Sequence, residues 1–182
     1  MKQNKVITIV GTGVIGAGWA ARFLAKGYKV KAFDPSSVSR EQLKINVRTA
    51  FKSLKKIGLN RNASLRNLKV YSKLPSALKD TTFVQENVPE NEKIKKNILK
   101  QIDSLVDKGV IIASSSSGLL PSKIQLACKF PERVLIGHPF NPVYLLPLVE
   151  IVAGKKTSPI SVKKLKKLYE HIGCLLYTSD AA

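Results

Sequence analysis

The stretch that decides the fold reads Val6-Ile7-Thr8-Ile9-Val10-Gly11-Thr12-Gly13-Val14-Ile15-Gly16. Its first five residues form an apolar, β-branched run, which is typical of a strand buried within a parallel sheet. The glycines that follow have the spacing G-x-G-x-x-G, directly after this strand and before a helical pattern. Gly11 would permit a tight turn, Gly13 the close approach of a pyrophosphate, and Gly16 close packing of helix on strand. The stretch predicts a dinucleotide-binding turn made of Gly11, Thr12, Gly13, Val14, Ile15 and Gly16.

Strand patterns alternate with helical patterns along the rest of the chain. Strands are expected at 28–33, 69–71, 82–84, 110–113, 134–137 and 148–152, and helices before Gly27, at 36–58, at 91–108, from Pro121 and at 158–172. In the helix at 91–108, one apolar face is expected to comprise Ile94, Ile98, Ile102 and Leu105. This alternation predicts an α/β domain with a doubly wound, mostly parallel sheet of the Rossmann type, covered on both faces.

An acidic residue, Asp34, follows the second predicted strand, eighteen residues after Gly16. A carboxylate at this place accepts hydrogen bonds from the ribose diol of a dinucleotide. Its negative charge would repel a 2′-phosphate, so NAD is the expected cofactor rather than NADP. The residues alone also allow a glycine-rich turn that serves only packing.

Polar residues gather at the ends of later predicted strands. Serines occupy 114–117, and His138, Asn141 and Glu150 lie in or beside the next two strands. Ligands of open α/β sheets bind at this carboxyl edge. An imidazole beside a carboxylate suits oxidation of a secondary alcohol, because a base must take the hydroxyl proton while hydride leaves carbon. A hydrogen-bonded structural histidine is the alternative, and His171 is expected at the surface.

The motifs Gly137-His138-Pro139-Phe140-Asn141-Pro142 and Leu148-Val149-Glu150 resemble the catalytic region of the L-3-hydroxyacyl-CoA dehydrogenase superfamily. Residues 1 to about 172 are similar to the NAD-binding domain of that family, and 141–150 resembles its carnitine 3-dehydrogenase branch more than its acyl-CoA branch. The resemblance implies NAD-dependent oxidation of the 3-hydroxyl of L-carnitine to 3-dehydrocarnitine. An L-3-hydroxyacyl-CoA substrate is the alternative, and a homodimer is implied for the full-length form.

The resemblance also implies roles for individual residues. His138 would be the general base, Glu150 its orienting partner, and Ser117 a hydrogen-bond donor to the substrate oxygen. Positions that line the cofactor in the family correspond to Glu90, Lys95, Ser117 and Asn141. Family members usually carry paired serines where this chain has Ser117 followed by Gly118, so the second hydroxyl is missing here.

The charge of the chain suggests a different class of protein. There are 31 lysine and arginine residues against 12 aspartate and glutamate residues, a net charge of +19, which invites a nucleic-acid or membrane partner. Eight basic and no acidic residues lie between Lys44 and Lys69, but Phe51 is the only aromatic residue there, so a stacking platform for bases is missing. We expect a small-molecule substrate and neither a nucleic-acid nor a membrane partner. A basic module that binds NAD or nucleic acid without catalysis is the alternative from another class.

Only two cysteines are present, Cys128 and Cys174, which excludes a disulfide framework and a cysteine-rich zinc site. Cys128 lies in an apolar run and is expected to be an ordinary buried residue. We therefore expect no metal and a reducing, cytoplasmic location.

The end of the chain departs from the family. Relatives are expected to continue into a helical domain that closes the site, so residues 1–173 are interpreted as an NAD-binding domain truncated at its C-terminal end. Residues 174–182 do not resemble the family's continuation and are interpreted as a non-native tail, for which no structure is predicted. We expect such a chain to bind NAD weakly and to turn over little substrate.

Overall fold

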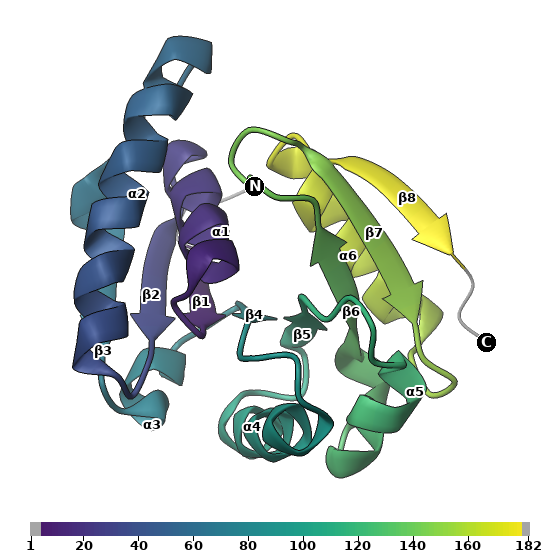
Figure 1. The fold of residues 1–182 in the computed structure, drawn as a ribbon. Coiled ribbons are helices and arrows are strands. Elements are labelled where there is room, and N and C mark those ends of the chain that lie inside the picture. Colours follow the sequence, from purple (N-terminus) through teal and green to yellow (C-terminus); the bar gives the residue numbers. More distant parts are fainter. Residues whose placement is uncertain (1–4, 180–182) are drawn as a thin grey trace.

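The computed structural model describes residues 5–179 of the chain. Within this range eight strands form one sheet in the order β3-β2-β1-β4-β5-β6-β7-β8 (Figure 1). The strands are β1 (Val6–Val10), β2 (Lys29–Phe33), β3 (Leu68–Tyr71), β4 (Phe83–Glu86), β5 (Ile111–Ser114), β6 (Val134–Pro139), β7 (Leu148–Ala153) and β8 (Leu175–Ser179). Every neighbouring pair is parallel except β6 and β7. The predicted doubly wound, mostly parallel sheet is confirmed.

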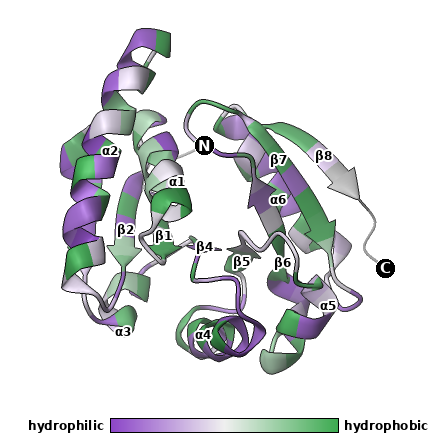
Figure 2. Cartoon of the chain, in the orientation of Figure 1, coloured by the Kyte–Doolittle hydropathy of each residue, from purple (hydrophilic) through white to green (hydrophobic). Residues whose placement is uncertain are grey.

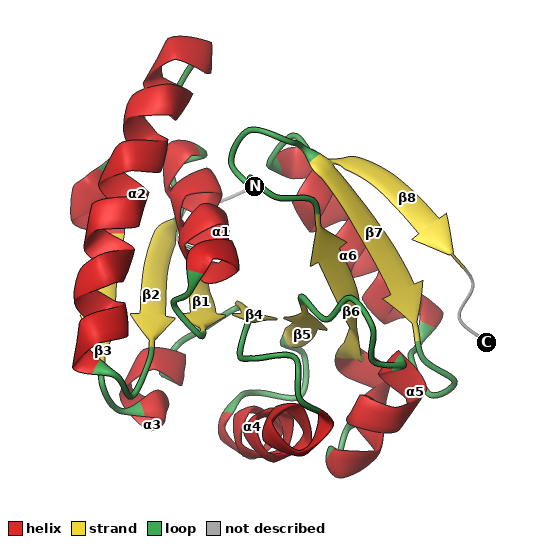
Figure 3. Ribbon diagram, in the orientation of Figure 1, coloured by secondary structure: helices red, strands yellow, loops and turns green. Residues whose placement is uncertain are grey.

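Helices cover both faces of the sheet (Figure 3). They are α1 (Val14–Ala25), α2 (Ser37–Ile57), α3 (Leu74–Leu78), α4 (Glu92–Leu105), α5 (Pro121–Ile124) and α6 (Pro159–His171), with short 3₁₀ turns at Leu65–Asn67, Gln125–Ala127 and Pro131–Arg133. One core cluster joins α1, α2 and α6 to the sheet, and a second joins α3, α4 and α5 to the opposite face. The result is the expected three-layer arrangement of helices, sheet and helices.

The first layer follows from the sequence pattern. The apolar helix α1 is buried along most of its length, whereas α2 buries only Leu43, Val47, Ala50 and Leu54, and Figure 2 shows its alternating hydrophobic and hydrophilic turns. Ser36 is the N-cap of α2, and its hydroxyl accepts a hydrogen bond from the amide of Ser39 at 3.2 Å. Trp19 of α1 stacks on Tyr169 of α6, with ring centroids 5.0 Å apart, and this contact joins two helices that are distant in the sequence.

The order of the strands creates a crevice at the carboxyl edge. Strand β1 pairs with β2 on one side and with β4 on the other. The strands that follow β1 therefore extend the sheet in one direction, and those that follow β4 extend it in the opposite direction. Open α/β sheets bind ligands at such a switch point. Only residues 140–147 connect β6 to β7, which is too short for a crossover and makes this pair antiparallel. The antiparallel register sets Glu150 opposite His138.

The predicted apolar face of α4 is partly wrong. Ile94 and Leu105 are 45% and 46% exposed, and the helix ends at Leu105 rather than at 108. The buried residues of the helix are instead Lys95, Leu99, Ile102 and Asp103. Two charged side chains of this helix are buried because each has a buried partner of opposite charge, Glu86 for Lys95 and Arg133 for Asp103.

The end of the chain, for which no structure was predicted, carries one more strand. Leu175–Ser179 extends the sheet as β8, parallel to β7, and the half-buried Leu176 packs on the core. Apolar, β-prone residues beside the edge of β7 explain this pairing. That the sequence of this tail is non-native stays a prediction, as do the domain boundaries.

Cys128 is buried, as predicted. Burial, reinforced by the nearby Asp103 carboxylate, raises the pKa of its thiol to about 12, with Arg133 partly opposing the shift. A thiol in this state is no nucleophile near neutral pH. No helix among residues 5–179 has the length and apolar character required to cross a membrane.

Candidate active site

The glycine-rich turn lies where β1 ends, at the crevice. Gly11 has a φ of +87°, and its amide donates to the carbonyl of Phe33 at 2.9 Å. A Cβ on Gly16 would lie 2.0 Å from the carbonyl oxygen of Gly11, so only glycine lets α1 begin so close to the turn. A Cβ on Gly13 would meet no atom within 4 Å, so this side of the turn is open.

The N-terminus of α1 fits the pyrophosphate of a dinucleotide. Gly13 is its N-cap, no side chain caps the amides, and the first turn carries no acidic residue. Uncapped amides and the positive end of the helix dipole together attract an anion. With the open face of Gly13, the turn has both the space and the donors that a phosphate group needs.

Asp34 stands beside this turn, immediately after β2. One carboxylate oxygen accepts hydrogen bonds from the amide and the hydroxyl of Thr12, both at 3.0 Å, and the other accepts from the amide of Ser36 at 3.0 Å. Arg40 donates to the carbonyl oxygens of Asp34 and Pro35 at 2.7 and 2.8 Å. These contacts hold an acidic group at the place where a ribose diol would follow the pyrophosphate.

His138 and Glu150 face each other across β6 and β7. The Nδ1 atom of His138 lies 3.5 Å from a carboxylate oxygen of Glu150, and the two side chains are 26% and 32% exposed. That nitrogen is buried and makes no hydrogen bond with the described residues. The ring of Phe140 lies beside the imidazole, with centroids 5.7 Å apart. Since Nδ1 faces Glu150, the Nε2 side of the ring is the one left for a substrate.

Ser117 lies in the loop after β5, and Glu90 holds that loop in place. One oxygen of the Glu90 carboxylate accepts hydrogen bonds from the hydroxyl of Ser116 and from the amides of Ser117 and Gly118, the amides at 3.1 and 2.9 Å. Desolvation raises the pKa of Glu90, but these hydrogen bonds and the ammonium of Lys95 outweigh it, so the net shift is downward. Glu90 therefore fixes the position of the serine loop.

Lys95 is almost completely buried. Its ammonium group lies 2.9 and 3.1 Å from the two carboxylate oxygens of Glu86, 3.1 Å from the carbonyl of Val88 and 3.5 Å from Glu90. Burial raises the pKa of Glu86, while Lys95 and the hydroxyl of Ser114 oppose this shift. Lys95 is thus committed to joining α4 to the ends of β4 and β5, with little capacity for further hydrogen bonds.

A buried polar network that the sequence analysis did not predict supports the same edge. The amide nitrogen of Gln85 donates to the hydroxyl of Ser115 at 2.9 Å and to the carbonyl of Gly137 at 3.3 Å, and its oxygen accepts from the hydroxyl of Tyr169 at 2.6 Å. Ser115 in turn donates to Asn87 at 2.7 Å. The sequence pattern carried no signal of this network, since Gln85 lies one residue beyond the strand expected at 82–84.

These groups surround a cavity of about 340 Å³ at the carboxyl edge. Its lining comprises Ile15, Asn87, Val88, Pro89, Glu90, Lys95, Ser115, Ser117, His138 and Pro139. The structure thus brings Glu90, Lys95, Ser117 and His138 together beside the glycine turn. Asn141 is instead exposed on the loop between β6 and β7 and does not line this cavity.

A dinucleotide turn at a switch point, beside a histidine paired with a carboxylate, defines a nucleotide-binding α/β domain of the dehydrogenase class. Residues 6–175 match the family model of the 3-hydroxyacyl-CoA dehydrogenase NAD-binding domain. The chain belongs to this family, which confirms the resemblance seen in its motifs and the prediction of NAD as the cofactor.

Relatives and solved structures agree with this assignment. The chain is 46% identical over 168 residues to an L-carnitine dehydrogenase of Bacillus cereus, covering 92% of this chain and 52% of the relative, and 47% identical over 165 residues to one of Staphylococcus epidermidis, covering 91% and 51%. A solved (S)-3-hydroxybutyryl-CoA dehydrogenase, PaaH1 of Ralstonia eutropha, is similar with a TM-score of 0.90 and 30% identity, covering 98% of this chain and 64% of that one. The chain therefore spans about half the length of the curated relatives it matches.

Proposed function

We propose that this chain is the NAD-binding half of a dehydrogenase that oxidises the 3-hydroxyl of L-carnitine to 3-dehydrocarnitine. The observation that carries the proposal is the placement of His138, paired with Glu150, in one cavity with Ser117 and next to the glycine turn. The identity of more than 40% to the two L-carnitine dehydrogenases supports the choice of substrate.

Each residue has a defined task in this proposal. NAD, when bound at the glycine turn and Asp34, supplies the hydride acceptor. His138 takes the proton of the substrate hydroxyl at Nε2, and the carboxylate of Glu150 favours the imidazolium that forms at the ring. The hydroxyl of Ser117 donates to the substrate oxygen, and Glu90 keeps the serine loop in position through its two backbone amides.

An L-3-hydroxyacyl-CoA is the second candidate substrate. The net charge of +19 favours it, because a basic surface attracts the polyanionic CoA and repels the trimethylammonium group of carnitine. The solved 3-hydroxybutyryl-CoA dehydrogenase with 30% identity has the same fold over 98% of this chain. Both substrates use the same proton transfer, so they differ only in the contacts beyond the reacting carbon.

A chimaera tests the substrate directly. Residues 6–175 of this chain replace the matching half of the Bacillus cereus L-carnitine dehydrogenase, and NADH formation is followed at 340 nm with L-carnitine and with (S)-3-hydroxybutyryl-CoA. We expect turnover of carnitine and little with the CoA ester. The opposite preference would overturn the carnitine assignment and leave the dehydrogenase assignment intact.

Two variants of the chimaera test the roles of the residues. His138→Gln should lower kcat by roughly 10²–10⁴-fold, the usual contribution of a general base, with NAD affinity unchanged. Glu150→Gln should lower kcat less and move the acidic limb of the pH profile. The matched control is Glu132→Gln, an exposed glutamate that lies outside the cavity. Activity of His138→Gln equal to that of the control would exclude His138 as the base.

A further inference from the structure

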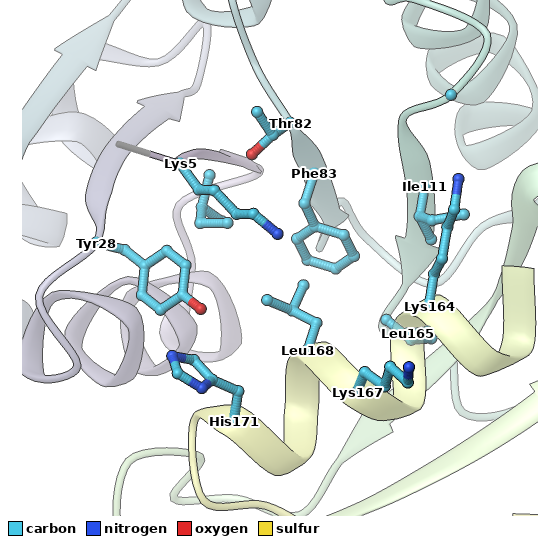
Figure 4. A pocket seen from close by; sticks show the side chains of 12 residues that line it. Lys5, Tyr28, Thr82, Phe83, Ile111, Lys164, Leu165, Lys167, Leu168 and His171 are labelled. Carbon is cyan, nitrogen blue, oxygen red and sulfur yellow. The ribbon is translucent and has the colours of Figure 1, made fainter. Parts of the chain in front are cut away.

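A second cavity lies at the amino edge of the sheet, on the opposite side from the glycine turn. Its volume is about 300 Å³, and it opens between α6 and the amino ends of β1, β4 and β5 (Figure 4). Apolar and aromatic side chains form its inner wall, and basic side chains stand at its rim. It shares no residue with the cavity of the candidate active site.

The inner wall of this second cavity is apolar. Ile7, Phe83, Ile111 and Leu165 are all buried and belong to the core cluster on this face of the sheet. Tyr28 adds an aromatic wall, which meets the imidazole of His171 edge-on with centroids 6.1 Å apart. A hollow with such walls shields an apolar group from water as a ligand pocket does, and its volume is at the lower end for small-molecule sites.

The rim, in contrast, carries only basic charges. Lys5 enters from the start of β1, while Lys164, Lys167 and His171 come from α6, and Figure 4 shows the Lys5 amine extending between Tyr28 and Phe83. Among residues 5–179, no aspartate or glutamate lines the cavity. The three ammonium groups place positive charge at the mouth of the hollow, and a bound anion would offset that charge.

The combination of wall and rim selects the chemistry of a ligand. A neutral apolar molecule would leave the lysines unpaired, and inorganic phosphate would leave the apolar wall uncovered. A molecule with an apolar body and one carboxylate satisfies both, since the body covers Phe83 and Ile111 while the carboxylate reaches the lysines. The position excludes direct contact with the groups proposed for the reaction, because these stand at the carboxyl edge.

We propose that the cavity formed by Tyr28, Phe83, Ile111 and the basic face of α6 is a binding site for a small carboxylate with an aliphatic or aromatic body. The site is independent of the proposed dehydrogenase function. Octanoate represents the aliphatic form of this ligand and benzoate the aromatic form.

NMR titration of the 182-residue chain tests the site. Octanoate and benzoate are added to ¹⁵N-labelled protein, with octan-1-ol and octylammonium as probes that keep the apolar body and lose the negative charge. We expect saturable shifts of the amides of Ile7, Phe83, Ile111 and Leu168 with at least one carboxylate, and binding roughly tenfold weaker for the two controls. Equal binding of octan-1-ol, or shifts confined to the carboxyl edge, would overturn the proposal.

A pair of charge reversals tests the rim. Lys164→Glu combined with Lys167→Glu should weaken the binding of the carboxylate roughly tenfold or more. Lys155→Glu combined with Lys156→Glu changes the net charge by the same amount at an exposed turn outside the cavity and serves as the matched control. If both double variants weaken binding equally, the effect is that of net charge and the site is refuted. Dispersed amide spectra establish that each variant is folded.

Discussion

Two acid–base pairs in this domain are built in opposite ways. Asp103 and Arg133 are each 2% exposed and lie 2.6 Å apart, and the guanidinium also donates to the carbonyls of Asp103, Asp107 and Val110. His138 and Glu150 are about a third exposed or less and lie 3.5 Å apart, and Nδ1 of the histidine makes no hydrogen bond within residues 5–179. The protein fills the hydrogen-bonding capacity of the first pair, whereas His138 of the second keeps an unused nitrogen atom.

The difference in hydrogen bonding suits the first pair to stabilising the fold and the second pair to proton transfer. A buried charge is tolerated only when partners compensate for its lost hydration, so the saturated pair is a condition of folding. A general base must change its protonation and exchange partners during a reaction, which a saturated group does not do readily. The loose pair at the carboxyl edge is therefore the one suited to catalysis.

Breaking the saturated pair should have the largest effect. Arg133→Met leaves the carboxylate of Asp103 buried without its counter-charge, and we expect a loss of about 3–5 kcal/mol in the free energy of unfolding, measured by urea denaturation with circular dichroism. The double variant Asp103→Asn with Arg133→Met should recover part of this loss, because the asparagine oxygen still accepts from the amides of Lys129 and Phe130. A double variant no more stable than the single one would contradict the charge argument.

The second effect concerns the strand that carries His138. A Cβ on Gly137 would lie 2.1 Å from the hydroxyl oxygen of Tyr169, so Gly137→Ala should cost about 1–3 kcal/mol through overpacking. Tyr169→Phe should cost about 1–3 kcal/mol because Gln85 loses a buried donor. Since the second change removes the nearest clashing atom, the double variant should cost less than the sum of the two. Strict additivity in urea denaturation would show that the two residues do not interact as described.

Parts of this comparison could be predicted from the sequence, and parts could not. The strand ending in Gly11, the acid at Asp34 and the motif around His138 have local signatures, because turn geometry and strand burial are set by neighbouring residues. The saturated pair has no such signature, since Asp103 and Arg133 are thirty residues apart and meet only when α4 docks on the sheet. For the same reason Ile94 and Leu105 were wrongly predicted to lie on the buried face of α4.

The candidate site divides in the same way. Its histidine, carboxylates and serine were predicted from residue types and from the resemblance, but the network of Gln85, Ser115 and Tyr169 was not, because it joins three elements that are far apart in the chain. The edge strand β8 was not predicted, because residues 174–182 were set aside as a non-native tail.

Breaking the His138–Glu150 pair should hardly change stability. His138→Gln removes a ring whose Nδ1 makes no hydrogen bond within the described residues, so we expect a change of no more than about 0.5–1 kcal/mol in the same urea experiment. The two variants are compared by their changes in the free energy of unfolding, which should be several-fold larger for Arg133→Met. A cost comparable to that of Arg133→Met would show that His138 is a structural residue, the alternative that its sequence context left open.

The smallest expected effect is a pH dependence of stability caused by the Glu90 carboxylate. Its pKa in the folded protein is lowered from the ordinary 4.5, so its ionised form adds stability above that pH, and this contribution is lost as the pH falls below 4.5 through the lowered value. The Glu90 side chain is 40% exposed, so screening by water keeps the contribution below about 1 kcal/mol. Glu90→Gln should therefore lower the urea midpoint at pH 6 and lower it less at pH 3. An equal difference at both pH values would mean that the carboxylate charge does not hold the serine loop, and that packing of the side chain alone does.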